Sequence, residues 1–302
     1  MELLRLLAEI RSPAMEQIFK YITLIGDQTL IIAVICIIFW CANKELAYKA
    51  VLSLLISGFA VQVMKISFRV ERPWIIDPGF KVSEAGLSGA TGYSFPSGHS
   101  QCAAALFGAS AQFGKKIWIK VICLLTVAAV GFSRMYLGVH TLADVITGII
   151  LTLAAVFLVS VIYNKFLCTA KYDPAVSAVL IMLSVAAAVY PAVLLNADTI
   201  NAENAADCIK FAGTLLGAAA GYYIERRYVK FNVQEINILL HIVKIIIGLA
   251  GVAALEIGIK SILGAYFYAD FIRYSLIVVW ALAVFPWLWM KLAVKLKLKE
   301  KN

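Results

Sequence analysis

Three short polar clusters interrupt an otherwise apolar chain, and their side chains are of types that bind and transfer phosphate. The clusters contain eight candidate site residues: Lys65, Arg72, Ser97, Gly98, His99, Arg134, His140 and Asp144. Three of these are cations and only one is a carboxylate, so a shared site would attract a polyanion. A phosphate suits such a site because the planar guanidinium of arginine binds two phosphate oxygens at once.

The pair His140 and Asp144 has the spacing of a nucleophile and its orienting group. Residues four apart share one face of a helix, so the carboxylate can accept a hydrogen bond from the N–H of one ring nitrogen. The other ring nitrogen is then free to attack phosphorus. His99 lies on another segment and could donate a proton to the departing alkoxide. The pattern predicts His140 as nucleophile, Asp144 as its orienting carboxylate and His99 as general acid.

The segment Ser97-Gly98-His99 opens an apolar run, which predicts a helix N-terminus there. Free backbone N–H groups and the positive end of the helix dipole bind anions, and a glycine lets the backbone approach the ligand closely. The predicted phosphate-binding residues are Lys65, Arg72, Ser97, Gly98 and Arg134. One aspartate and two separated histidines are too few ligands for a hard metal ion, so neither a metal nor another cofactor is expected.

The elements that position these residues are predicted to be membrane spans. Hydrophobic residues form 62% of the 302-residue chain, which favours an all-α, polytopic transmembrane helical bundle. Nine apolar runs are candidate spans: 19–41, 46–68, 99–114, 117–138, 141–166, 175–196, 208–224, 237–258 and 272–291. An amphipathic interfacial helix is expected before them at 1–13, with Leu3, Leu4, Leu7 and Ile10 on one face. The six cysteines are predicted to be small core residues, and a cleaved signal peptide is not expected.

The distribution of lysine and arginine predicts the orientation in the membrane. With the N-terminus outside, the inner loops and tail hold most of the cations, including Lys115, Lys116, Lys120, Arg226, Arg227, Lys297, Lys299 and Lys301. The net charge of +9 is therefore attributed to loops that face anionic lipid, and nucleic acid is not an expected partner. All three polar clusters then fall on the outer face, which independently supports a common site.

The three clusters resemble the signature of the type 2 phosphatidic acid phosphatase superfamily, whose fold is shared with vanadium-dependent haloperoxidases and glucose-6-phosphatase. The signature is matched at every position by Lys65, Arg72-Pro73, Pro96-Ser97-Gly98-His99, Ser133-Arg134, His140 and Asp144. The resemblance implies the same nucleophile, orienting carboxylate, general acid and phosphate-binding residues that the side-chain chemistry predicts.

Two features depart from the usual pattern of that superfamily. Two predicted spans precede the first motif where its lipid phosphatases typically have three, and about four further spans follow the core. We therefore divide the chain into an interfacial helix at 1–13, a phosphatase core at 14–168 and a C-terminal extension at 172–302 of unknown role.

The expected function is hydrolysis of a lipid phosphate or pyrophosphate at the outer surface of the plasma membrane, through a phosphohistidine intermediate and without a metal. Candidate substrates are phosphatidic acid, phosphatidylglycerol phosphate, undecaprenyl pyrophosphate and a sphingoid phosphate; the oligomeric state is not predicted. Two alternatives stay open: a phosphotransferase that resolves the same intermediate with an acceptor hydroxyl, and a lipid transporter or flippase with a vestigial site.

Three further features have predicted roles. The glycine-rich loop 79–94 is pliable enough to cover the phosphate as a lid. Asp27, inside the first span, is expected to be structural. The repeat of Gly213, Gly217 and Gly221 predicts close helix packing.

Overall fold

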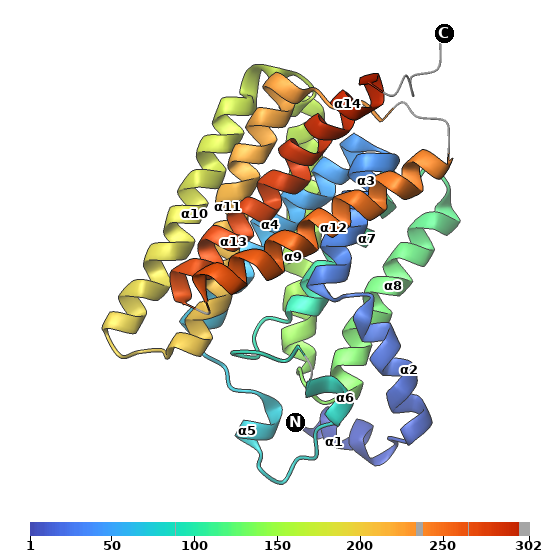
Figure 1. The fold of residues 1–302 in the computed structure, drawn as a ribbon. Helices are drawn as coiled ribbons and strands as arrows, with labels where there is room; N and C mark the ends of the chain where they lie inside the picture. The colour runs from blue at the N-terminus through green and yellow to red at the C-terminus, as the bar shows by residue number, and fades with distance from the viewer. Residues whose placement is uncertain (88, 234–237, 265, 296–302) are drawn as a thin grey trace. The chain divides into compact units, whose positions relative to one another are not determined.

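The computed structural model describes residues 1–302 except 88, 234–237, 265 and 296–302, and the described residues are all-α, with no β-strand among them (Figure 1). The α-helices are α1 (Glu2–Glu9), α2 (Pro13–Leu24), α3 (Gln28–Cys41), α4 (Lys44–Phe68), α5 (Pro73–Ile76), α6 (Glu84–Leu87), α7 (Gly98–Phe113), α8 (Ile117–Tyr136), α9 (Leu142–Ile162), α10 (Asp173–Asn196), α11 (Ala202–Ile224), α12 (Ile238–Leu263), α13 (Phe267–Val279) and α14 (Phe285–Lys295). Short turns of other helix types are η1 (Tyr163–Leu167), η2 (Ala170–Tyr172), η3 (Glu225–Val229) and η4 (Trp280–Val284). The predicted all-α class is confirmed.

Within the described residues, six helical segments are long and apolar enough to cross a membrane, or seven if α2 and α3 form one span bent by 45°. The predicted count of nine is not confirmed. Of the two remaining predicted spans, α7 has 16 residues, short of the roughly 20 that cross a bilayer. The other, α11, contains Asp207 and Lys210 as well as many small residues, which lower its hydropathy.

The chain divides into two compact units: residues 1–35 with 48–161, and residues 36–47 with 162–302. All eight predicted site residues belong to the first unit. The predicted inner-loop residues Lys297, Lys299 and Lys301 lie outside the described residues.

In the first unit, glycines let α9 approach α7 and α8 closely. A Cβ atom on Gly148 would lie 2.8 Å from the carbonyl oxygen of Ser97, and one on Gly131 would lie 2.7 Å from the Val145 side chain. The start of α9 is therefore held against the start of α7 and the last part of α8. These are the helix ends that carry the second and third polar clusters.

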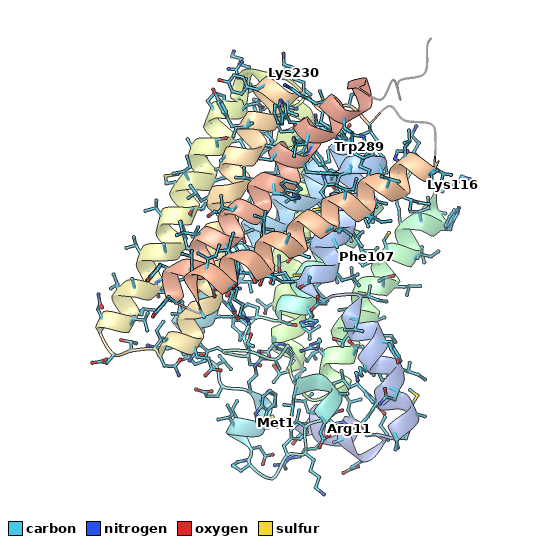
Figure 2. The ribbon with its side chains drawn as sticks, viewed as in Figure 1. Met1, Arg11, Phe107, Lys116, Lys230 and Trp289 are labelled. Atoms are coloured by element: carbon cyan, nitrogen blue, oxygen red, sulfur yellow. The ribbon has the colours of Figure 1, made fainter. Side chains whose placement is uncertain are left out.

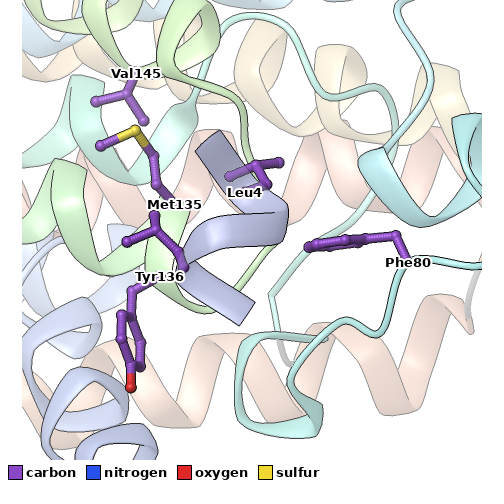
Figure 3. Close-up of a cluster of buried hydrophobic side chains, with 6 residues drawn as sticks. Leu4, Phe80, Met135, Tyr136 and Val145 are labelled. Atoms are coloured by element: carbon purple, nitrogen blue, oxygen red, sulfur yellow. The ribbon is translucent and has the colours of Figure 1, made fainter. Parts of the chain in front are cut away.

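The N-terminal helix α1 docks on the same unit, and only some of its apolar residues are buried there. Leu4 and Leu7 are buried in a cluster with Phe80, Met135, Tyr136 and Val145 (Figure 3). Leu3 and Ile10, predicted to share their face, remain exposed. These residues share one arc of the helix as predicted, but tertiary contacts bury only the part of that arc that meets the loop before α6 and the end of α8.

In the second unit, the glycine repeat of α11 packs against α13. A Cβ on Gly213 would clash with the carbonyl oxygen of Phe271, and one on Gly217 with that of Ser275. Side chains at these positions would push the two helices apart, so the predicted close packing is confirmed.

Candidate active site

His140 and Asp144 form a buried pair at the start of α9. His140 Nδ1 lies 3.4 Å from Asp144 Oδ2, and both side chains are 2% exposed. His140 precedes the helix instead of lying on it, so the expected shared helical face was wrong. A local turn produces the pairing, since the backbone N–H of Thr141 donates to Asp144 Oδ2 over 2.8 Å.

Ser94 is a third member of this buried group, and the sequence did not single it out. Its hydroxyl donates to Asp144 Oδ2 over 2.6 Å and lies 3.4 Å from His140 Nδ1. One serine in a polar loop has no periodicity or motif spacing to mark it. Its place two residues before the Pro96-Ser97 motif was the one available signal.

Arg72 occupies the other side of the His140 ring. Its Nη1 lies 3.0 Å from His140 Nε2, and the guanidinium also donates to the carbonyl oxygens of Thr91, Gly92 and Val139 over 2.6–3.1 Å. Because arginine can only donate, Nε2 must be the acceptor, and the ring proton then resides on Nδ1 facing Asp144. Arg72 thereby ties the glycine-rich loop to the segment that carries His140.

The surroundings keep the His140 ring neutral. Burial, reinforced by the charges of Arg72 and Arg134, lowers the pKa of His140 below its ordinary value, while Asp144 opposes the shift. A neutral imidazole with an unprotonated Nε2 is the form that can act as a nucleophile.

Arg134 is fully buried and only partly satisfied. Its Nη1 donates to the hydroxyl of Thr23 on α2 over 2.8 Å, but Nε and Nη2 have no hydrogen-bond partner in the described structure. Buried donors that form no hydrogen bond destabilise the folded state. An edge with two free, parallel donors matches the oxygens of a phosphate. Thr23 was also not predicted as a site residue from the sequence.

The start of α7 combines a capped helix with open space. Ser97 is the N-cap of this helix and accepts a hydrogen bond from Ser100, while its own N–H donates to the carbonyl oxygen of Asp144 over 3.0 Å. A Cβ atom on Gly98 would meet nothing within 4 Å. The first turn is thus joined to α9 yet leaves room beside Gly98, as anion binding at a helix N-terminus requires.

His99 is half-buried and lies within electrostatic reach of Lys65, Arg72, Arg134 and His140. Gly89, at φ +79°, sits beside its ring: a Cβ there would lie 3.4 Å from His99 Cε1. The glycine-rich loop therefore passes over the second histidine as well. The structure brings the three cations, both histidines and Asp144 into one site.

Asp27 lies at the break between α2 and α3, where its carboxylate accepts the N–H groups of Thr29 and Leu30 over 2.9 and 3.1 Å. It caps α3, as the structural interpretation predicted. Among the described residues, no group of three His, Cys, Asp or Glu side chains is arranged to hold a metal ion.

Two family profiles and a curated relative match this chain. The profile of the PAP2 superfamily matches residues 46–168, and that of the PAP2 superfamily phosphatase transmembrane extension matches residues 209–300. A phosphatidylglycerophosphatase B from Bacillus subtilis (strain 168) is 31% identical over 164 residues, which cover 50% of this chain and 76% of the relative. The chain belongs to the PAP2 superfamily, the type 2 phosphatidic acid phosphatases, and is a multi-pass membrane enzyme of the lipid phosphatase class.

Two solved structures resemble the chain. A transmembrane PAP2-type phosphatidylglycerolphosphate phosphatase from Bacillus subtilis is 25% identical, with a TM-score of 0.46, covering 55% of this chain and 84% of that one. LpxE from Aquifex aeolicus is 23% identical, with a TM-score of 0.45, covering 53% of this chain and 93% of that one.

Proposed function

We propose that the chain hydrolyses a lipid phosphate or pyrophosphate through a phosphohistidine formed on His140 Nε2. The observation that carries the proposal is the setting of this nitrogen. Asp144 accepts from the opposite side of the ring, and two unsatisfied donors of buried Arg134 belong to the same site. Attack requires the Arg72 guanidinium to move from Nε2 onto the phosphate oxygens.

The chemistry proceeds in two displacements. The lone pair of His140 Nε2 forms a P–N bond while the P–O bond to the lipid breaks, and His99 donates a proton to the leaving alkoxide. Water then attacks phosphorus, His99 accepts its proton, and cleavage of the P–N bond restores the imidazole. Lys65, Arg72, Arg134 and the N–H groups near Gly98 stabilise the charge on the equatorial oxygens. These fixed cations supply the stabilisation that a metal provides elsewhere, so the proposed mechanism is metal-independent.

The substrate class is inferred from the membrane setting and from the relatives. Relatives named as phosphatidylglycerophosphatases make phosphatidylglycerol phosphate the first substrate to test. Phosphatidic acid, undecaprenyl pyrophosphate and a sphingoid phosphate complete the panel.

We place the site on the extracytoplasmic face of the plasma membrane, with the C-terminus in the cytoplasm. Lys115 and Lys116 precede α8, whereas Arg134 and His140 lie at its other end. A helix of 20 residues is about 30 Å long, enough to cross the hydrocarbon core, and lysines favour the cytoplasmic side. Figure 2 shows Lys116 and Arg11 at opposite ends of the first unit.

The test is release of phosphate from the lipid panel by the purified full-length chain, in buffer with EDTA. We expect His140→Ala to abolish release and His241→Gln, a change in the second unit, to leave it intact. Loss of wild-type activity in EDTA would refute the metal-independent mechanism. Product formation only when an acceptor alcohol is supplied would identify a phosphotransferase instead.

A further inference from the structure

The N-terminal helix α1 has three chemically distinct faces. Leu4 and Leu7 are buried against the first unit. Glu2, Arg5 and Glu9 are exposed on a second face, and Leu3, Leu6 and Ile10 are exposed on a third. A helix with protein, water and lipid on its three sides requires this division.

The short helix α5 also carries exposed apolar side chains. Ile75 and Ile76 are 53% and 54% exposed and follow Arg72 closely in the chain. Their backbone N–H groups donate to the carbonyl oxygen of Arg72 over 2.9 and 3.0 Å. The two isoleucines are therefore fixed relative to a predicted phosphate-binding residue.

Several contacts fasten α1 to α5 and to the loops of the site. Arg5 pairs with Asp77, the residue after α5, over 2.6 Å. Arg11 donates to the carbonyl oxygens of Tyr136, over 2.8 Å, and of Lys81. Trp74 packs against the cluster that buries Leu4 and Leu7. Since α1 is tied to the segment that follows Arg72 and to residues on both sides of His140, its exposed apolar face keeps a fixed relation to the site.

We propose that five residues form a lipid-contacting rim at which a lipid in the outer leaflet delivers its phosphate to the site: Leu3, Leu6, Ile10, Ile75 and Ile76. The rim rests among acyl chains at the interface while the charged face of α1 stays in water. Its occupant is a bilayer lipid, because the protein is a multi-pass membrane protein and α2, which follows α1 and belongs to a candidate span, also exposes Ile18, Tyr21 and Leu24. A substrate can then reach Arg72 without its hydrocarbon chain leaving the bilayer.

The contact itself is tested without reference to activity. In a Cys41→Ser, Cys168→Ser background, Leu6→Cys and Glu9→Cys are each labelled with the fluorophore NBD, and the full chain is placed in phosphatidylglycerol–phosphatidylcholine vesicles. We expect blue-shifted emission at position 6 that nitroxide-labelled phospholipid quenches, and water-like emission at position 9 that iodide quenches. Water-like emission at both positions would overturn the rim.

The delivery role rests on the proposed function and is tested by comparing two substrates. Leu6→Glu and Ile76→Glu should each reduce hydrolysis of a lipid phosphate in vesicles about tenfold, because a charge expels the rim from the acyl region. Hydrolysis of soluble p-nitrophenyl phosphate should change less than about twofold, since that substrate does not cross the rim. Glu9→Gln, on the water face, is the matched control and should leave the hydrolysis of both substrates unchanged.

Equal losses on both substrates, or no loss on either, would overturn the delivery role. A wild-type chain inactive on both substrates would instead refute the proposed function and leave the fluorescence result standing.

Discussion

The protonation state of His140 follows from the groups at its two ring nitrogens. Arg72 can only donate to Nε2, and Asp144 lies beside Nδ1, so the arrangement selects one neutral tautomer. Nothing in the linear spacing of the motifs specifies this state. It arises because the side chains of Arg72 and His140, 68 residues apart in sequence, are in contact in the protein interior.

The lowered pKa of His140 predicts the acid limit of activity. A histidine ordinarily protonates near pH 6.5, but here burial disfavours the cation, so the nucleophile stays neutral in more acidic solution. We expect the activity that depends on neutral His140 to persist below pH 6.5 and to fall only on further acidification. A kcat/KM profile for a soluble phosphate checks this; an inflection at or above pH 6.5 assigned to His140 by NMR would contradict it.

The same shift predicts how stability varies with pH. The folded state binds a proton at His140 less readily than the unfolded chain does. The contribution of His140 to the free energy of unfolding is therefore complete above about pH 6.5 and declines as the pH falls. Thermal unfolding of wild type and His140→Gln between pH 7.5 and pH 5 should show a smaller acid-induced loss in the variant. Parallel curves would contradict the prediction.

Ser94→Ala should lower kcat about tenfold, because it removes a buried hydrogen bond to the Asp144 carboxylate. The acid limb of the pH profile should shift as well, since Asp144 would interact differently with His140. Ser94→Thr, which keeps the hydroxyl, should restore part of the activity. Ser110→Ala, which removes a hydroxyl bonded within α7, is the matched control; an equal loss there would indicate a general packing effect.

Thr23→Val should raise KM about tenfold with a smaller change in kcat, because it removes the hydrogen bond by which Thr23 orients Arg134. Thr23→Ser keeps the hydroxyl and should restore affinity for substrate and for inorganic phosphate as inhibitor. If the serine variant lost as much affinity as the valine variant, keeping the hydroxyl would not be sufficient, and the role assigned to this hydroxyl would be contradicted.

At the scale of elements, the site depends on how closely α7 and α9 approach. The contact of Gly148 with the Ser97 carbonyl places a helix cap beside the His140–Asp144 pair. The sequence marked these helices by their apolar runs, but it could not reveal that this glycine has no room for a side chain.

Gly148→Ala should therefore reduce activity about tenfold and lower the melting temperature, although alanine is ordinarily the better helix former. Its Cβ would press on backbone, which cannot move as a flexible side chain can. Gly258→Ala, where a Cβ would meet nothing within 4 Å, is the control and should be neutral or slightly stabilising. Unchanged activity in Gly148→Ala would show that α9 can shift without disturbing the site.

For the molecule as a whole, PAP2 profiles cover both the part that holds the site and most of the later helices. The later segment is thus a recognised extension within the superfamily. Close packing of α11 with α13 shows that it has a core of its own.

The proposed orientation is testable on intact cells. In a Cys168→Ser background, a cysteine replacing exposed Lys116 should resist a membrane-impermeant maleimide until the membrane is opened. A cysteine replacing exposed Glu9, at the other end of the first unit, should react at once. The reverse pattern would place the site in the cytoplasm.

The sequence by itself determined the helical class, the membrane setting and the eight residues that meet at the site. It could do so because apolar runs and motif spacings are local properties of the chain. Only the tertiary structure decided which partners complete that site. Ser94 and Thr23 form hydrogen bonds with residues that are distant in sequence. The leucines of α1 become either buried or exposed only when the helix docks on the protein. Burial decided the rest, because the unsatisfied edge of Arg134 and the neutral His140 ring exist only where packing excludes water.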